Sequence, residues 1–143
     1  MKRLLRLYAV SLLVVAAGCG PADETSTFNI TSPDAYNQQI MRGRQLQQAW
    51  TTTPHRIMQY LLGPDNNEEP SPFEYRQVVQ VDSVIIATVT EEGIQDDAVY
   101  GKRTVLTFVR AGGGGWVVKQ MKVGYKCRED RGQSEAYSGT WCN

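Results

Sequence analysis

Two strand-forming runs separated by a four-glycine turn constrain the fold of this 143-residue chain most strongly. Residues 104–109 and 116–123 are rich in β-branched and aromatic side chains, which favour extended strands. The glycines at 112–115 tolerate the positive φ angles that a hairpin connection requires. The sequence therefore predicts an antiparallel hairpin over 104–123.

The same glycine run raises the alternative of a phosphate-binding loop. A P-loop needs a Lys-Ser/Thr pair at the start of a helix. Here the glycines are followed by Trp116, Val117 and Val118, which favour a strand. We therefore interpret the glycines as a turn.

The first 19 residues have the layout of an export signal. Lys2, Arg3 and Arg6 precede an apolar run that ends in small residues before Cys19, an arrangement typical of secretory signals. The apolar run is too short to cross a bilayer. In one interpretation, residues 17–18 form an ordinary cleavage site and Cys19 is incidental.

A second interpretation gives Cys19 a role. Residues 15–19, with the sequence VAAGC, resemble the lipobox of bacterial lipoproteins. The resemblance implies cleavage before Cys19, acylation of that cysteine and attachment of the mature protein to a membrane. Gly20 replaces the aspartate that retains many lipoproteins in the inner membrane, which implies the outer membrane, facing the periplasm.

The three cysteines bear on the same question. If Cys19 is acylated, Cys127 and Cys142 are each other's only partner in an oxidising compartment, and we expect them to form a disulfide. The competing hypothesis is a zinc site. Two cysteines and the distant His55 are a poor set of tetrahedral ligands, so we expect no metal and no cofactor.

The chain divides into three predicted segments. These are a signal peptide over 1–18, a lipid-anchored flexible tether over 19–31 and a single globular domain over 32–143. The tether is polar and lacks a helical period. The domain is long enough to bury one modest core.

Two helices are predicted at the start of the domain. Ser32 and Pro33 suit an N-cap and a first helical position, and an apolar stripe continues to about Trp50. Thr53 and Pro54 repeat this start signal for a second helix that ends at residue 63.

An apolar–polar alternation over residues 73–89 predicts extended structure. One strand of this length would be unusual, so we expect a bend or bulge near residues 82–83. The predicted fold class is α+β, with two N-terminal helices packed on a curved antiparallel β-meander of three or four strands. This arrangement looks like the cystatin or NTF2-like architectures.

The C-terminal part, about fifty residues, contains several spaced positions that carry a resemblance: residues 96–103, Gly115, Trp116, Cys127, Arg131, Gly132 and Cys142. This part looks like a small exported domain found in cyanobacterial proteins of unknown function. In those proteins a histidine follows the Arg-Gly pair, where this chain has Gln133. The resemblance implies export and a fold but no activity.

Charge is distributed unevenly along the chain. Without residues 1–18 it has 12 Lys+Arg against 15 Asp+Glu, and this negative balance, together with export, disfavours nucleic-acid binding. Residues 19–100 hold 4 basic and 12 acidic side chains, and residues 101–143 hold 8 and 3. The split could guide a charged partner, but we favour complementary surfaces within one fold.

The leading functional hypothesis is a lipid-anchored binding or accessory module. Its sheet or its disulfide loop would contact another envelope protein or a cell-wall polymer. Arginine and aromatic residues often anchor interfaces, and we expect the two arginines of the loop to be exposed and free of buried partners. Tyr137 and Trp141 could equally pack the tail onto the sheet. The candidate contact residues are Arg128, Arg131, Tyr137 and Trp141.

Two alternatives stay open. One is an NTF2-like pocket enzyme or small-ligand-binding protein that uses Asp82 or His55 within the sheet's concavity. No nucleophile has a supporting sequence context, so we favour an enzyme less. The other is an anchored immunity or exclusion inhibitor, which is a special case of binding.

Overall fold

The computed structural model describes residues 24–63, 73–81 and 83–143. The predicted signal peptide, Cys19, the first part of the predicted tether and Asp82 lie outside these residues. No helix in the described part of the chain is long and apolar enough to span a bilayer.

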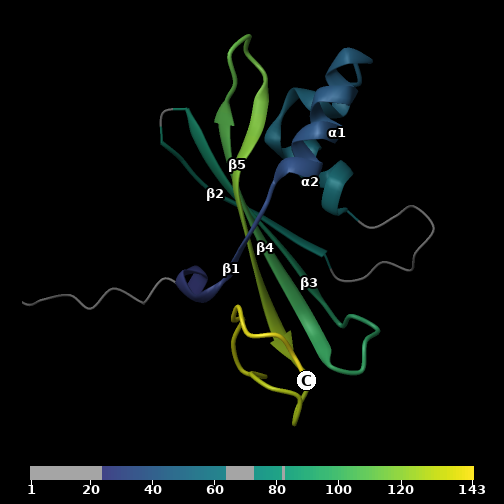
Figure 1. The fold of residues 1–143 in the computed structure, drawn as a ribbon, viewed down its shortest axis with the longest axis vertical. Helices are drawn as coiled ribbons and strands as arrows, with labels where there is room; N and C mark the ends of the chain where they lie inside the picture. The colour runs from purple at the N-terminus through teal and green to yellow at the C-terminus, as the bar shows by residue number, and fades with distance from the viewer. Residues whose placement is uncertain (1–23, 64–72, 82) are drawn as a thin grey trace, which may run out of the picture.

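The described residues form a mixed α+β fold, as predicted. Five antiparallel strands form one twisted sheet in the order β1-β5-β4-β3-β2 (Figure 1). The strands are β1 (Asn29–Thr31), β2 (Phe73–Val81), β3 (Val84–Glu92), β4 (Val99–Arg110) and β5 (Trp116–Cys127). The helices are α1 (Asp34–Gln45) and α2 (Pro54–Leu62), with short 3-10 turns η1 (Glu24–Thr27) and η2 (Ala49–Thr52).

The hairpin predicted around the glycine run is confirmed, and it is longer than predicted. Strand β4 pairs with β5 from Val99 opposite Cys127 to Arg110 opposite Trp116. At its tip, Gly113 and Gly114 both have φ of 91°, a left-handed conformation that a side chain would strain. The glycines therefore serve the turn.

The bend expected near residues 82–83 is instead a full reversal of the chain. Val81 lies opposite Val84, so the long alternating run is two paired strands, with a register shift between Val78 and Gln80. A connection of two residues preserves the odd–even alternation on both sides. The pattern could therefore not distinguish one bent strand from a hairpin.

Helix α2 begins as predicted, with Thr53 as its N-cap, whereas the N-cap of α1 is Pro33, one residue later than the predicted Ser32. The amide of Asp34 donates to Oγ of Ser32 at 3.2 Å, and the amide of Arg56 donates to Oγ1 of Thr53 at 3.3 Å. Pro54 occupies the first turn of α2, where a missing amide costs nothing.

Helix α1 ends earlier than the predicted boundary near Trp50. Its last residue is Gln45, because Gln47 takes a left-handed φ of 53° and the amide of Gln48 donates to the carbonyl of Gly43 at 2.9 Å. Such a bond closes a helix end. The apolar stripe continued past this point in the sequence, but a local backbone motif stopped the helix.

The main core lies between one face of the sheet and the helices. Strands β3, β4 and β5 contribute buried aliphatic and aromatic side chains, and three fully buried residues come from α1 and α2. The core consists of Ile40, Ile57, Met58, Ile85, Ala87, Val89, Leu106, Phe108, Trp116, Val118, Met121 and Val123.

The opposite face of the sheet carries a second, smaller cluster of Phe28, Val105 and Tyr137. Phe28 is only 5% exposed, and the strand that follows it pairs with β5. The prediction of a flexible tether reaching residue 31 is therefore wrong from residue 24 onward. The folded structure therefore includes residues 24–31.

Two glycines let the aromatic rings of this cluster approach the sheet. A Cβ atom on Gly124 would lie 2.5 Å from a ring carbon of Phe28, and one on Gly101 would lie 2.8 Å from the hydroxyl of Tyr137. Any side chain at either position would displace a ring, so each ring packs directly on backbone.

The segments on which these two rings lie also contact each other. We call this contact, between residues 27–29 and Gly139, the terminal seam. The amide of Gly139 donates to the carbonyl of Thr27 at 3.1 Å, and the side-chain amide of Asn29 donates to the carbonyl of Gly139. The start and the end of the described chain thus cover one face of the sheet together.

The outer edge of β5 is closed along most of its length. The side chain of Asn37 in α1 donates to the carbonyl of Val118 at 2.8 Å and accepts from its amide at 2.9 Å. Strand β1 pairs farther along the edge, and Ser138 then exchanges two backbone hydrogen bonds with Tyr125 at 2.7 and 2.9 Å. An exposed edge would invite pairing with another chain, and these contacts prevent it.

Candidate functional site

The candidate site is the disulfide loop, which we define as residues 127–142. Sγ of Cys127 and Sγ of Cys142 are bonded at 2.13 Å, in agreement with the predicted pairing, and their Cα atoms are 5.4 Å apart. Both cysteines are buried in a small cluster with Val99. The disulfide therefore fixes the end of the chain to the end of the sheet.

Backbone hydrogen bonds order the loop between its two cysteines. The amide of Cys127 donates to the carbonyl of Gln133 at 2.8 Å. The amide of Asn143 donates to the carbonyl of Arg131 at 2.9 Å, and the amide of Arg131 donates to the carbonyl of Arg128 at 3.1 Å. The loop thus has a defined conformation that can present side chains in fixed positions.

Arg128 is only partly exposed, whereas we expected an exposed arginine that is free of buried partners. Its Nε donates to the carbonyl of Asp96 at 2.6 Å, and its Nη2 donates to the carbonyl of Ile94 at 2.8 Å. Its amide also donates to the carbonyl of Ala98 at 2.8 Å. Arg128 therefore fastens the disulfide loop to the turn between β3 and β4, and the prediction that its side chain is exposed is wrong.

The turn that Arg128 contacts is itself organised by Asp96. A carboxylate oxygen of Asp96 accepts from the amides of Ala98 and Val99, both at 2.8 Å. The bond from Val99 and then the bond from Ala98 hold the pKa of Asp96 below its usual range, because they favour the charged carboxylate.

Tyr137 packs the tail onto the sheet, the second of the two roles considered above. Only 5% of it is exposed, and its hydroxyl donates to Oε1 of Glu92 at 2.8 Å. The guanidinium of Arg103 lies 4.0 Å from the centre of its ring. Burial, followed by the bond to Glu92, raises the pKa of Tyr137 far above its ordinary value.

Trp141 and Arg131 are the exposed members of the predicted set. Trp141 is 62% exposed, and its ring meets the ring of Tyr125 edge-on, with centroids 4.4 Å apart and planes at 72°. Arg131 is exposed on the same loop. Of the four predicted contact residues, two hold the loop in place, namely Arg128 and Tyr137. The other two, Arg131 and Trp141, are exposed on the loop.

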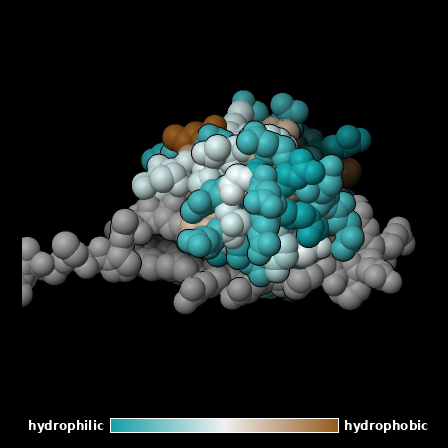
Figure 2. All heavy atoms as spheres, turned by 90° about the horizontal axis from the view of Figure 1, so that it is seen from below, coloured by the Kyte–Doolittle hydropathy of each residue, from teal (hydrophilic) through white to brown (hydrophobic). Residues whose placement is uncertain are grey.

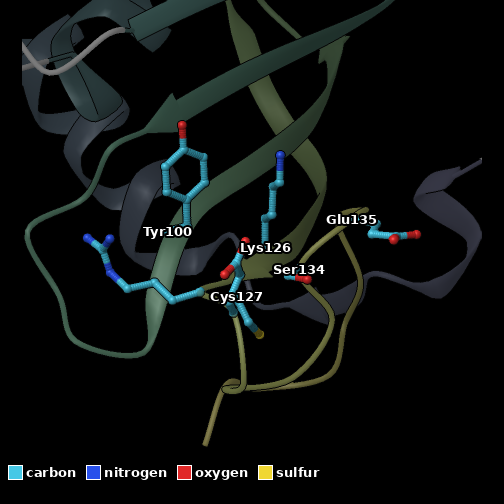
Figure 3. A pocket seen from close by; sticks show the side chains of 7 residues that line it. Tyr100, Lys126, Cys127, Ser134 and Glu135 are labelled. Carbon is cyan, nitrogen blue, oxygen red and sulfur yellow. The ribbon is translucent and has the colours of Figure 1, made fainter.

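A polar groove lies beside the loop, where β4 begins and β5 ends. Figure 3 shows Tyr100 and Lys126 extending in the same direction from neighbouring strands, with Nζ of Lys126 5.2 Å from the centre of the Tyr100 ring. Acidic and basic side chains both line it, which suits hydrogen bonding to a polar partner. The lining residues are Tyr100, Lys126, Cys127, Arg128, Glu129, Ser134 and Glu135.

Sequence reasoning missed the contribution of Tyr100 and Lys126 to this groove. The register of β4 and β5 shifts between Val99 and Gly101, so alternation along β4 could not assign Tyr100 to a face. The sequence does contain one signal for the groove. An aromatic residue, Tyr100, precedes Gly101, and a basic residue, Lys126, precedes Cys127.

The surface around this end of the molecule is mainly hydrophilic. Figure 2 views the molecule from below, the side on which Figure 1 places the C-terminal loop, and most of the coloured spheres are teal. Brown spheres gather only near the margin of this view. A partner of this end would therefore meet polar and charged groups around a few exposed apolar ones.

His55 and metal binding receive no support from the described residues. His55 is exposed on α2, which lies on the helical side of the sheet, away from the disulfide loop (Figure 1). No three His, Cys, Asp or Glu side chains in the described ranges are grouped as metal ligands would be. Asp82 lies outside those ranges.

No family model matches the chain, and no match is found among curated proteins or solved structures.

Proposed function

We propose that this protein is a lipid-anchored binding module of the bacterial envelope and that it contacts another envelope component through the exposed side of the disulfide loop. The observation that carries the proposal is Trp141, which stays 62% exposed on a loop fixed by a disulfide and by Arg128. A pre-ordered aromatic side chain loses little entropy on binding. Arg131 adds a charge on the same loop.

The anchoring part of the proposal rests on the sequence. Acylation of Cys19 would place the domain at a membrane, and Gly20 favours the periplasmic side of the outer membrane. The resemblance of the C-terminal part to an exported cyanobacterial domain supports the same location. Metabolic labelling with a fatty acid, compared with a Cys19→Ala variant, tests this step separately from binding.

The proposed fold relationship is to the cystatin or NTF2-like architectures. The shared core of α1, α2 and the twisted sheet supports it. An anchored immunity or exclusion inhibitor is one form of this binding module, and the identity of the captured partner would distinguish it.

The test is chemical crosslinking and affinity capture of the intact protein from its native membranes. We expect Trp141→Ala and Arg131→Ala to reduce recovery of a specific partner. Met41→Ala is the matched control, because Met41 is an apolar side chain with 57% exposure on α1. Equal recovery with all three variants would contradict the role of the loop.

A further inference from the structure

The distance between the proposed lipid anchor and the folded domain is short. The described chain begins with η1 at Glu24, and only four residues separate it from Cys19. Five residue steps reach at most about 18 Å when fully extended. We call residues 20–23 the leash. A domain of this length has a radius of gyration of about 14 Å, so the maximum reach of the leash hardly exceeds the radius of the domain.

A leash of this length limits which part of the domain can face the membrane. The side that carries η1, β1 and the terminal seam must stay nearest to the acylated cysteine. Figure 1 places η1 to one side of the sheet and the helices α1 and α2 at its other end. The helices therefore point away from the membrane when the leash is short.

The exposed residues next to η1 suit a membrane surface. Phe28 and Ile30 are two residues apart and therefore lie on the same face of the sheet. Phe28 is covered, whereas Ile30 is 72% exposed. Lys122 lies directly opposite Ile30 in the register of β1 and β5 and is partly exposed. A lysine is attracted to anionic headgroups, and an aliphatic side chain beside it can enter the headgroup region.

We propose that the β1 edge of the domain, through Ile30 and Lys122, rests on the phospholipid headgroups of the membrane that holds Cys19. The inference depends on the proposed acylation of Cys19. It gives the domain a fixed orientation, with the terminal seam toward the bilayer and the helices toward the aqueous space. A partner of the disulfide loop is then one found at the membrane surface, not one at a distance from it.

Photo-crosslinking to lipid tests this contact. The full-length acylated protein carries p-benzoylphenylalanine in place of Ile30 and is reconstituted into vesicles of phosphatidylethanolamine and phosphatidylglycerol. The matched control carries the same group in place of Tyr60, which is 57% exposed on α2. We expect a lipid adduct at position 30 and little at position 60. Equal labelling of both positions, or stronger labelling at position 60, would overturn the orientation.

Lengthening the leash provides the second measurement. Twenty Gly/Ser residues inserted after Ala22 lower the effective concentration of the surface at the membrane roughly tenfold, so the adduct at position 30 should fall by about that factor. Lys122→Glu with the original leash should lower it as well. Mass spectrometry of the same samples reports acylation of Cys19. An acylated protein without an adduct at position 30 refutes this inference alone, whereas absence of acylation refutes the proposed anchoring and the inference with it.

Discussion

Arg128 and Arg131 are three positions apart and have different surroundings. Arg128 donates two side-chain hydrogen bonds to carbonyls of the turn between β3 and β4, whereas Arg131 is exposed. The partners of Arg128 lie 32 and 34 residues earlier in the chain. No local sequence pattern reports a contact of that range, which is why the two arginines looked equivalent.

Replacement of these arginines should separate their roles. Arg128→Ala removes charge-assisted bonds from a partly buried position, and we expect a loss of about 1–2 kcal/mol in the free energy of unfolding. Arg131→Ala should stay within about 0.5 kcal/mol, as exposed substitutions usually do. Urea unfolding of both variants measures the difference, and similar losses would show that Arg131 also holds the loop.

Tyr137 gives the stability a dependence on alkaline pH. Its pKa is raised in the folded protein by burial and then by the bond to Glu92. The contribution of the neutral phenol is therefore complete below the unfolded pKa of about 10 and is lost as the pH rises above that value. The folded state retains the proton over a range where the unfolded state releases it.

Tyr137→Phe tests this dependence. At neutral pH the variant should be less stable by about 1–2 kcal/mol, because Glu92 loses a hydrogen-bond donor. Above pH 10 the wild-type protein should lose stability more steeply than the variant, so the difference between them narrows. Thermal unfolding from pH 7 to 11 measures both curves, and parallel curves would contradict the assignment.

Among the elements, the hairpin of β4 and β5 and the starts of both helices were predictable from the sequence. Each depends on a local signal, namely a glycine turn between β-prone runs or a Ser/Thr–Pro pair before an apolar stripe. Strand β1 has only three residues and follows a polar segment. Its one signal was the alternation of Phe28 and Ile30, which is too short to indicate a strand without its partner β5.

The strand β1 region offers a direct test of its place in the fold. Phe28→Ala removes a ring that is 5% exposed and packs on Gly124, and we expect a loss of about 3 kcal/mol in stability. Ile30→Ala, two residues later and 72% exposed, should change the stability by no more than about 0.5 kcal/mol. Chemical denaturation compares the two. A small effect of Phe28→Ala on the stability would show that residues 24–31 are a tether and not part of the fold.

At the scale of the whole molecule, the disulfide was predictable from the sequence. The number of cysteines and the expected oxidising compartment indicated the pairing without any knowledge of the geometry. The division of the candidate site into holding and displayed residues was not predictable. It depends on the turn of β3 and β4 meeting the tail, and on the groove formed where β4 shifts register. Both are consequences of tertiary packing.

Removing the disulfide should release the loop without unfolding the sheet. The double variant Cys127→Ser/Cys142→Ser should lose about 3 kcal/mol in the free energy of unfolding, because a loop of this size gains conformational freedom in the unfolded chain. Denaturation of wild type in a reductant provides the comparison and should approach the value of the double variant. A variant as stable as the oxidised wild type would show that hydrogen bonds alone hold the loop.

The terminal seam also determines when the fold can be completed. Asn29 and Gly139 are 110 positions apart, so the early segment leaves the ribosome long before its partner has been synthesised. Contacts of such long range form late and slowly. For a chain exported as proposed, the edge of β5 near Tyr125 stays open until Ser138 has crossed the membrane. The topology thus postpones completion of the domain until residues 138–139 have been translocated, when this part of the chain need no longer be extended.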